Sequence, residues 1–116
     1  MTKRDPSALR ILPRHLKMVE ELLRQHLPDA EVWAYGSRMT GQGHEASDLD
    51  LVVRNPENLR VEIPGVAELK EAFTESDLPI QVDVVEWARI PESFHHNIEK
   101  KYVVVQDVDG RDLLAS

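Results

Sequence analysis

Apolar residues recur at helical spacing in three segments of the chain. The clearest segment begins at Pro13 and stops before Pro28, and its apolar residues are Leu16, Val19, Leu22, Leu23 and Leu27. Residues three and four positions apart lie on one face of a helix, so this stripe is expected to pack on a sheet. Each segment opens at a proline, which is favoured in the first turn because that position donates no intrahelical hydrogen bond. The pattern predicts helices over residues 13–27, 64–74 and 91–99.

Four shorter segments have the alternation or the apolar content of strands. They predict strands over residues 31–35, 49–53, 80–87 and 102–105. Ser37 is a plausible N-cap for a further short helix. Because helices and strands interleave, we expect an α+β fold in which a mixed four-stranded sheet is covered by helices mainly on one face. The length fits a single domain over residues 1–116, with its core at about 12–105.

The composition excludes several classes of protein. A hydrophobic content of 41% and a charged content of 30% fit a globular chain rather than a disordered one. The absence of cysteine rules out disulfides and a thiolate zinc site. No run approaches the roughly 20 apolar residues of a membrane span, so a cytoplasmic protein is expected. The net charge of -7 argues against a basic nucleic-acid-binding face, but a bound divalent cation would still permit a nucleotide.

Two aspartates at the start of the second predicted strand give the first chemical signal. If the strand begins near Leu49, Asp48 and Asp50 lie on one face, about 6 to 7 Å apart along the chain. Carboxylates held so close repel each other unless a proton or a metal lies between them. Paired hard oxygen ligands suit Mg²⁺, which often shares its coordination shell with substrate phosphates. The pair therefore predicts a magnesium site.

Asp83 interrupts the apolar run of the third predicted strand. If Val82 and Val84 face the core, Asp83 faces the other way. Pairing of the second and third strands would then bring Asp83 to the aspartate pair. Three carboxylates on two strands can hold two Mg²⁺ ions roughly 3.5 to 4 Å apart. We expect Asp48 and Asp50 to bind both ions and Asp83 to bind the ion at the attacking hydroxyl, while the other ion neutralises the departing pyrophosphate.

The turn after the first predicted strand supplies groups that bind phosphate. Gly36 allows the backbone amides to approach closely, Ser37 offers a hydroxyl and Arg38 offers a guanidinium. Nucleotidyl transfer depends mainly on positioning and on charge stabilisation, which a small domain can provide. Residues 36–50 therefore predict a site for a nucleoside triphosphate and its metal.

The order of these motifs resembles that of a known family. Gly36-Ser37, ten intervening residues, the Asp48-x-Asp50 pair and Asp83 on a later strand are similar to the minimal nucleotidyltransferases of the DNA polymerase β superfamily. The resemblance covers residues 12–105, including the order of helices and strands. It implies the nucleotidyltransferase fold and makes the three aspartates the catalytic metal ligands.

The resemblance also implies roles for the glycine-serine turn. Gly36 and Ser37 would hold the triphosphate, and Arg38 would contact its phosphates. Residues 39–41 depart from the family pattern, because Met-Thr-Gly stands where members often have a small residue, a second arginine and glycine.

A reaction and a partner follow from the same resemblance. Larger superfamily members recognise their acceptor with an added domain, and few residues follow the fourth predicted strand here, so we expect another chain to provide the acceptor. Minimal nucleotidyltransferases are commonly encoded beside a helical protein of the HEPN class, often a ribonuclease toxin. The implied function is an antitoxin that uses two Mg²⁺ ions to transfer AMP from ATP to a tyrosine of that partner.

Two other functions stay open at this point. The chain would also fit an antitoxin that neutralises its partner by contact while its catalytic face is silent. A third possibility is an enzyme that acts on a small molecule, as the aminoglycoside-modifying relatives do, with a pocket at a homodimer interface.

Several further residues support weaker hypotheses. His95 and His96 are neighbours on a predicted helix, where their side chains diverge by about 100°, so we expect them to be solvated or partner-facing rather than to share an ion. Trp33 and Trp87 lie on predicted strands and are expected in the core or an interface. His44 precedes the aspartates in a loop from which it could approach a nucleotide.

Overall fold

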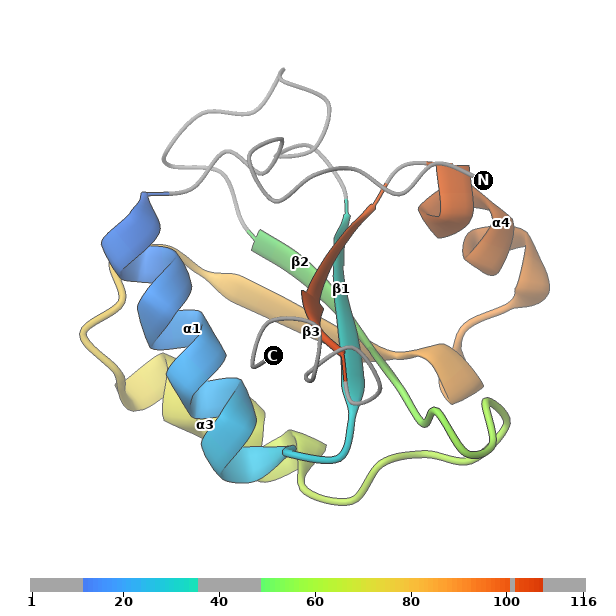
Figure 1. Cartoon of the computed structure of the whole chain (residues 1–116), viewed down its shortest axis with the longest axis horizontal. Coiled ribbons are helices and arrows are strands. Elements are labelled where there is room, and N and C mark those ends of the chain that lie inside the picture. The colour runs from blue at the N-terminus through green and yellow to red at the C-terminus, as the bar shows by residue number, and fades with distance from the viewer. Residues whose placement is uncertain (1–11, 36–48, 101, 108–116) are drawn as a thin grey trace, which may run out of the picture.

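Four strands form one mixed sheet at the centre of the fold (Figure 1). The computed structural model describes residues 12–35, 49–100 and 102–107. In chain order its elements are α1 (Pro13–His26), β1 (Glu31–Tyr35), β2 (Leu49–Arg54), α3 (Val66–Glu75), β3 (Val82–Glu86), η2 (Trp87–Arg89), α4 (Glu92–Lys100) and β4 (Val103–Gln106). The strand order is β3–β2–β1–β4, with β2 parallel to β3 and with β1 antiparallel to both β2 and β4. The expected α+β fold with a mixed sheet is confirmed.

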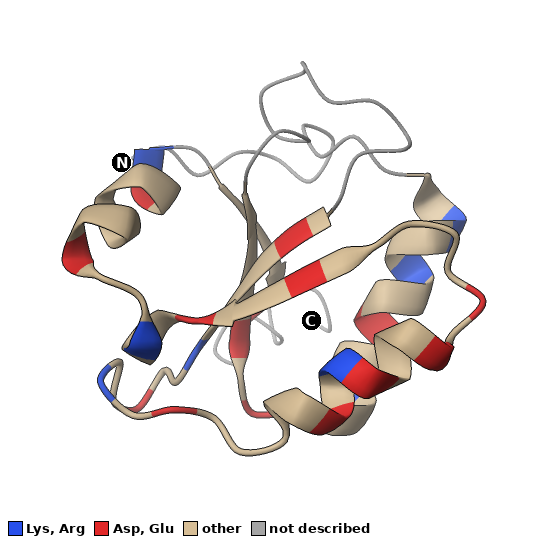
Figure 2. Ribbon diagram, turned by 180° about the vertical axis from the view of Figure 1, so that it is seen from behind, with Lys and Arg blue, Asp and Glu red and all other residues tan. Residues whose placement is uncertain are grey.

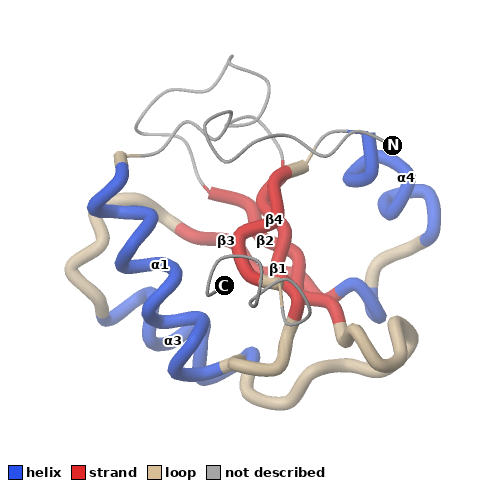
Figure 3. The backbone as a smooth tube through the Cα atoms, in the orientation of Figure 1, coloured by secondary structure: helices blue, strands red, loops and turns tan. Residues whose placement is uncertain are grey.

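The helices lie on both sides of the sheet, α1 and α3 on one face and α4 on the other (Figure 3). The larger core fills the space between the sheet and the first two helices. In β2, the alternate residues Leu49, Leu51 and Val53 are at most 2% exposed and belong to this core. Leu23 of α1 and Leu69 of α3 are buried in the same cluster. The apolar stripe of the first helix therefore packs on the sheet, as expected.

A second, aromatic cluster lies on the face that α4 covers. Its buried members are Trp33, Val52, Trp87, Ile98 and Tyr102. Trp33 stacks on Tyr102 with ring centres 3.9 Å apart, and it meets Trp87 edge to face at 5.5 Å. Both tryptophans are 5% exposed, which confirms that they are core residues.

Arg54 extends this cluster with a cation. Its guanidinium carbon lies 3.9 Å from the ring centre of Trp33 and 4.5 Å from that of Trp87. The carboxylate of Glu31 accepts a 2.6 Å hydrogen bond from Arg54 Nη1. Burial lowers the pKa of Arg54, and the charge of Glu31 opposes that shift. The guanidinium thus packs against both indoles, which lie at 74° to each other, while its edge is paired with a carboxylate.

The element boundaries differ from the predicted ones at two informative places. The helix expected from Pro64 begins at Val66, because Gly65 has a left-handed φ of 101° and cannot belong to the helix. Trp87, predicted at the end of a strand, lies in η2, because β3 ends at Glu86, opposite Val53 near the end of β2. The short helix expected after Ser37 lies outside the described residues. No helix in the described part of the chain is long and apolar enough to cross a membrane.

Replacing Arg54 with lysine should destabilise the fold. Lysine keeps the charge but has no planar group to pack against the two indoles. We expect the free energy of unfolding to fall by about 1 to 2 kcal/mol, measured by urea denaturation followed through tryptophan fluorescence.

Arg89→Lys is the matched control for this change. The Arg89 side chain is 66% exposed and lies 3.7 Å from Glu62, so its replacement should change the stability by less than about 0.5 kcal/mol. Equal urea midpoints for Arg54→Lys and the wild type would contradict the proposed role of the stacked guanidinium.

Candidate active site

Three polar side chains form a row across neighbouring strands. Asp50 of β2 is the Cα partner of Asp83 on the parallel strand β3, and it is also the partner of Tyr35 on the antiparallel strand β1. Residues that pair directly project from the same face of a sheet. Asp50 is half-buried and Asp83 is exposed. The expected pairing of the second and third strands is therefore present, and it brings Asp83 beside Asp50.

The apolar residues of the strands determine which way these carboxylates point. Leu49 and Leu51 are buried in the larger core, so the residue between them must face the opposite side. Val82 and Val84 pack with the same core, which turns Asp83 in the same direction as Asp50. Both carboxylates thus face the side of the sheet that carries α4. Seen from behind, acidic positions lie next to each other on two strands of the sheet (Figure 2).

Tyr35 reports the electrostatic character of this site. Its pKa is raised to about 12, first by burial and then by the negative charges of Asp50 and Asp83. The phenol is therefore neutral at physiological pH, and the space beside it favours positive charge. A divalent cation would relieve the repulsion between the two carboxylates.

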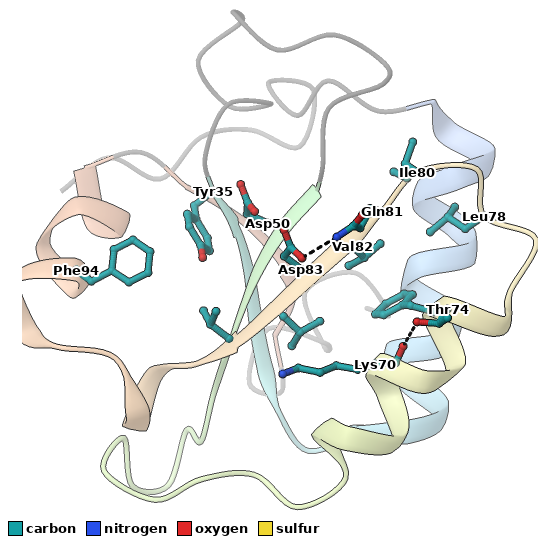
Figure 4. Close-up of a pocket in the computed structure, with 13 residues that line it drawn as sticks. Tyr35, Asp50, Lys70, Thr74, Leu78, Ile80, Gln81, Val82, Asp83 and Phe94 are labelled. Atoms are coloured by element: carbon teal, nitrogen blue, oxygen red, sulfur yellow. Dashed lines mark hydrogen bonds between the residues drawn. The ribbon is translucent and has the colours of Figure 1, made fainter.

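A pocket of about 720 Å³ opens onto the row (Figure 4). Its lining includes side chains from both faces of β3, so the pocket extends around the outer edge of that strand. Tyr35, Asp50, Asp83, Val85 and Phe94 line the part on the α4 side. Gln81 Nε2 donates a 3.4 Å hydrogen bond to Asp83 Oδ1, and the rings of Tyr35 and Phe94 meet edge to face at 5.7 Å. The volume falls within the usual range of small-molecule sites.

Two of the three expected metal ligands come together here. Asp50 and Asp83 provide hard oxygen donors at a pocket, which is the chemistry that Mg²⁺ requires, so these residues fit the expected ion. Within the described residues no three His, Cys, Asp or Glu side chains form a metal-binding group. The third expected ligand, Asp48, lies outside the described residues. The same is true of the predicted phosphate-binding residues Gly36, Ser37 and Arg38, and of residues 39–41 and His44.

The histidine pair has a structural explanation. The ring of His95 stacks on Trp87 at 3.8 Å and its Nε2 lies 2.7 Å from the backbone carbonyl oxygen of Trp87, which requires Nε2 to carry the proton. His96 is exposed and lies 3.8 Å from Glu92 and 3.6 Å from Glu99. The two side chains diverge as expected. His95 is half-buried against an indole rather than fully solvated, and a partner-facing role for the pair stays a prediction.

Sequence reasoning missed Tyr35 and Phe94 as parts of the site. Tyr35 alternates with Trp33 along β1, and this signal places it on the aromatic face. Its position beside Asp50 depends on the register between β1 and β2, which no local pattern specifies. Phe94 comes from α4, far from the carboxylates in sequence, and nothing in its spacing marks it as a pocket residue.

Comparison with known proteins shows the family. Residues 16–106 match the model of the nucleotidyltransferase domain. The chain belongs to this family. It is 44% identical over 99 residues to a Haemophilus influenzae protein named probable protein adenylyltransferase MntA, and the match covers 85% of each chain. The resemblance to the minimal nucleotidyltransferases is therefore confirmed, and the chain is a nucleotidyltransferase.

Solved structures agree with the fold. One crystal structure, of a toxin–antitoxin complex with AMP-PNP, matches with a TM-score of 0.63 and 22% identity over 89% of this chain and 80% of the other. Another, of the toxin–antitoxin pair MntA–HepT, matches with a TM-score of 0.60 and 18% identity over 89% of this chain and 79% of the other. At these identities the likeness concerns the fold alone.

The raised pKa of Tyr35 can be measured in a chain with two tyrosines. In Tyr102→Phe, phenolate absorbance should report Tyr35 alone, with a midpoint at about pH 12 in the folded protein. Because the unfolded phenol has a pKa of about 10, the folded state holds this proton more tightly, and the stability that it contributes below pH 10 is lost as the pH rises toward 12.

Removing a carboxylate tests the cause of the shift. Adding Asp50→Asn or Asp83→Asn to Tyr102→Phe should lower the midpoint only in part, because burial is the larger cause. A midpoint that does not respond to either change would contradict the placement of the phenol beside both carboxylates.

Proposed function

We propose that this chain is a Mg²⁺-dependent protein adenylyltransferase. It transfers AMP from ATP to a tyrosine of a helical HEPN-type toxin and is the antitoxin of that pair. The observation that carries the proposed chemistry is the in-register pairing of Asp50 with Asp83 beside a pocket. The protein acceptor is supported by the name of the 44% identical relative, and the toxin partner by the complexes in which similar folds occur.

Asp50 and Asp83 differ in exposure, and this difference supports separate roles for the two carboxylates. Asp50 lies at the centre of the row, half-buried, and would hold the metal against the nucleotide. Asp83 is exposed to the pocket and would meet the acceptor. When bound, Mg²⁺ supplies positive charge to the phosphates and lowers the pKa of a coordinated hydroxyl. Asp48 is proposed to complete the metal site, while Gly36, Ser37 and Arg38 hold the triphosphate.

The transfer itself is a displacement at the α-phosphorus. The acceptor hydroxyl oxygen forms a bond to the α-phosphorus as the bond from that phosphorus to the bridging oxygen of the β-phosphate breaks. The hydroxyl proton is released to solvent beside Asp83. Pyrophosphate departs with the electron pair of the broken bond. The protein contributes position and charge, which are the main requirements of phosphoryl chemistry.

Intact mass spectrometry of the partner tests this proposal. A co-encoded HEPN-type protein, incubated with the chain, ATP and Mg²⁺, should gain whole adenylyl units. Asp50→Asn and Asp83→Asn should each lower the rate by roughly a hundredfold or more, because a metal ligand is lost. Asp29→Asn, which alters an exposed aspartate in the turn after α1, is the matched control and should transfer normally.

Removing the metal separates catalysis from contact. A chelator should stop the transfer while the two proteins still form a complex in size-exclusion chromatography. Full neutralisation of the toxin by Asp50→Asn without any adenylyl gain would favour an antitoxin that acts by contact. Modification of a small molecule by the chain alone would instead favour the third function.

A further inference from the structure

The α4 side of the pocket combines an aromatic wall with an exposed carboxylate. We call this part the aromatic lobe and define it by Tyr35, Val85 and Phe94, which lie on the same side of β3 as Asp83. The rings of Tyr35 and Phe94 meet at 84° with centres 5.7 Å apart. Both residues are half-buried and line the pocket. Figure 4 shows Tyr35 between Phe94 and the two aspartates.

We propose that the aromatic lobe binds the ring of the acceptor side chain and makes the enzyme select tyrosine over serine and threonine. This inference rests on the proposed function and adds the residues that determine its acceptor specificity. The proposed transfer chemistry requires only a hydroxyl at the α-phosphorus. An additional ring-binding surface is needed to distinguish one hydroxyl amino acid from another.

The shape of the lobe supports an aromatic guest. Aromatic rings prefer edge-to-face or offset contacts, and the perpendicular pair of Tyr35 and Phe94 offers both a ring face and a ring edge. Val85 adds an apolar surface from the sheet. Asp83 and Val85 are two residues apart on β3 and point the same way, so a ring above Val85 would place its hydroxyl toward Asp83. The short side chain of serine or threonine would leave these apolar surfaces uncovered.

The chemistry of the lobe favours the acceptor ring over the adenine of ATP. A purine has several ring nitrogens and an amino group that need hydrogen-bond partners when they are buried. Val85 and Phe94 offer none. Beside them are the phenol of Tyr35 and the carboxylates, and the amide of Gln81 lies beyond Asp83, to which its Nε2 already donates a hydrogen bond. A tyrosine side chain has one polar atom, at its tip, and that atom is the reacting hydroxyl.

Two small acceptors measure the predicted selectivity. The chain is incubated with ATP, Mg²⁺ and millimolar N-acetyl-tyrosinamide or N-acetyl-serinamide, and the adenylylated products are quantified by mass spectrometry. Wild type should prefer the tyrosine amide. Phe94→Leu, which keeps apolar bulk without the ring, should lower the tyrosine-to-serine ratio about three- to tenfold. The KM for ATP should not change.

The chain offers a matched control, because its other phenylalanine is Phe73 of α3. Phe73 belongs to the larger core on the opposite face of the sheet and lines only the part of the pocket on that face. Phe73→Leu should lower the stability but keep the tyrosine-to-serine ratio, and Phe94→Tyr, which retains the ring, should restore the ratio. An unchanged ratio in Phe94→Leu would overturn the inference. So would a raised KM for ATP with the ratio intact, because that result would assign the lobe to the base.

A binding measurement keeps the inference separate from turnover. If wild type adenylylates neither amide nor the partner, the proposed function fails. The lobe is then tested with N-acetyl-tyrosinamide and the Mg²⁺–AMP-PNP form of the chain by NMR. Nuclear Overhauser contacts between the ligand ring and the rings of Phe94 and Tyr35, lost in Phe94→Leu, are expected. Their absence in the wild type would contradict the aromatic subsite independently of any activity.

Discussion

The parallel pairing of β2 with β3 is the constraint on which the site depends. It places Asp50 opposite Asp83, so that two negative charges share one face of the sheet at neighbouring positions. A divalent cation bound between them would relieve their mutual repulsion. Leu49 and Leu51 of β2, together with Val84 of β3, hold the register from the other face, because a slip of one residue would expose them. The core on one face thus holds two carboxylates side by side on the other, and the proposed metal site rests on this arrangement.

The face with α4 has two ends of different character. At one end, the guanidinium of Arg54 packs against two indoles in a closely packed aromatic layer. At the other end, the carboxylates meet the pocket. β1 connects the two, because its residues Glu31, Trp33 and Tyr35 alternate along the same face. The aromatic layer therefore supports the wall of the pocket, which helps to explain how a small fold can hold a binding site in a fixed shape.

Local patterns predicted the features that depend on one strand or one helix. Alternation along the apolar runs was enough to turn Asp50 and Asp83 to the same side, and the leucine stripe after Pro13 was enough to place α1 on the sheet. Local patterns could not predict how segments that are far apart in the sequence pack against each other. His95 covers an indole because η2 and α4 meet, and Tyr35 borders the carboxylates because of a cross-strand register. The glycine-serine turn and Asp48 remain sequence predictions, since they lie outside the described residues.

The central claim is that Asp50 and Asp83 share a metal site, and manganese binding tests it most directly. Electron paramagnetic resonance of Mn²⁺, titrated into the chain with AMP-PNP, should show two ions close enough to couple in the wild type, roughly 3.5 to 4 Å apart. Asp83→Asn should abolish the coupling and weaken Mn²⁺ binding by at least about tenfold, whereas Asp29→Asn should leave both unchanged. Equal Mn²⁺ affinity and equal coupling in the wild type, Asp50→Asn and Asp83→Asn would contradict the account.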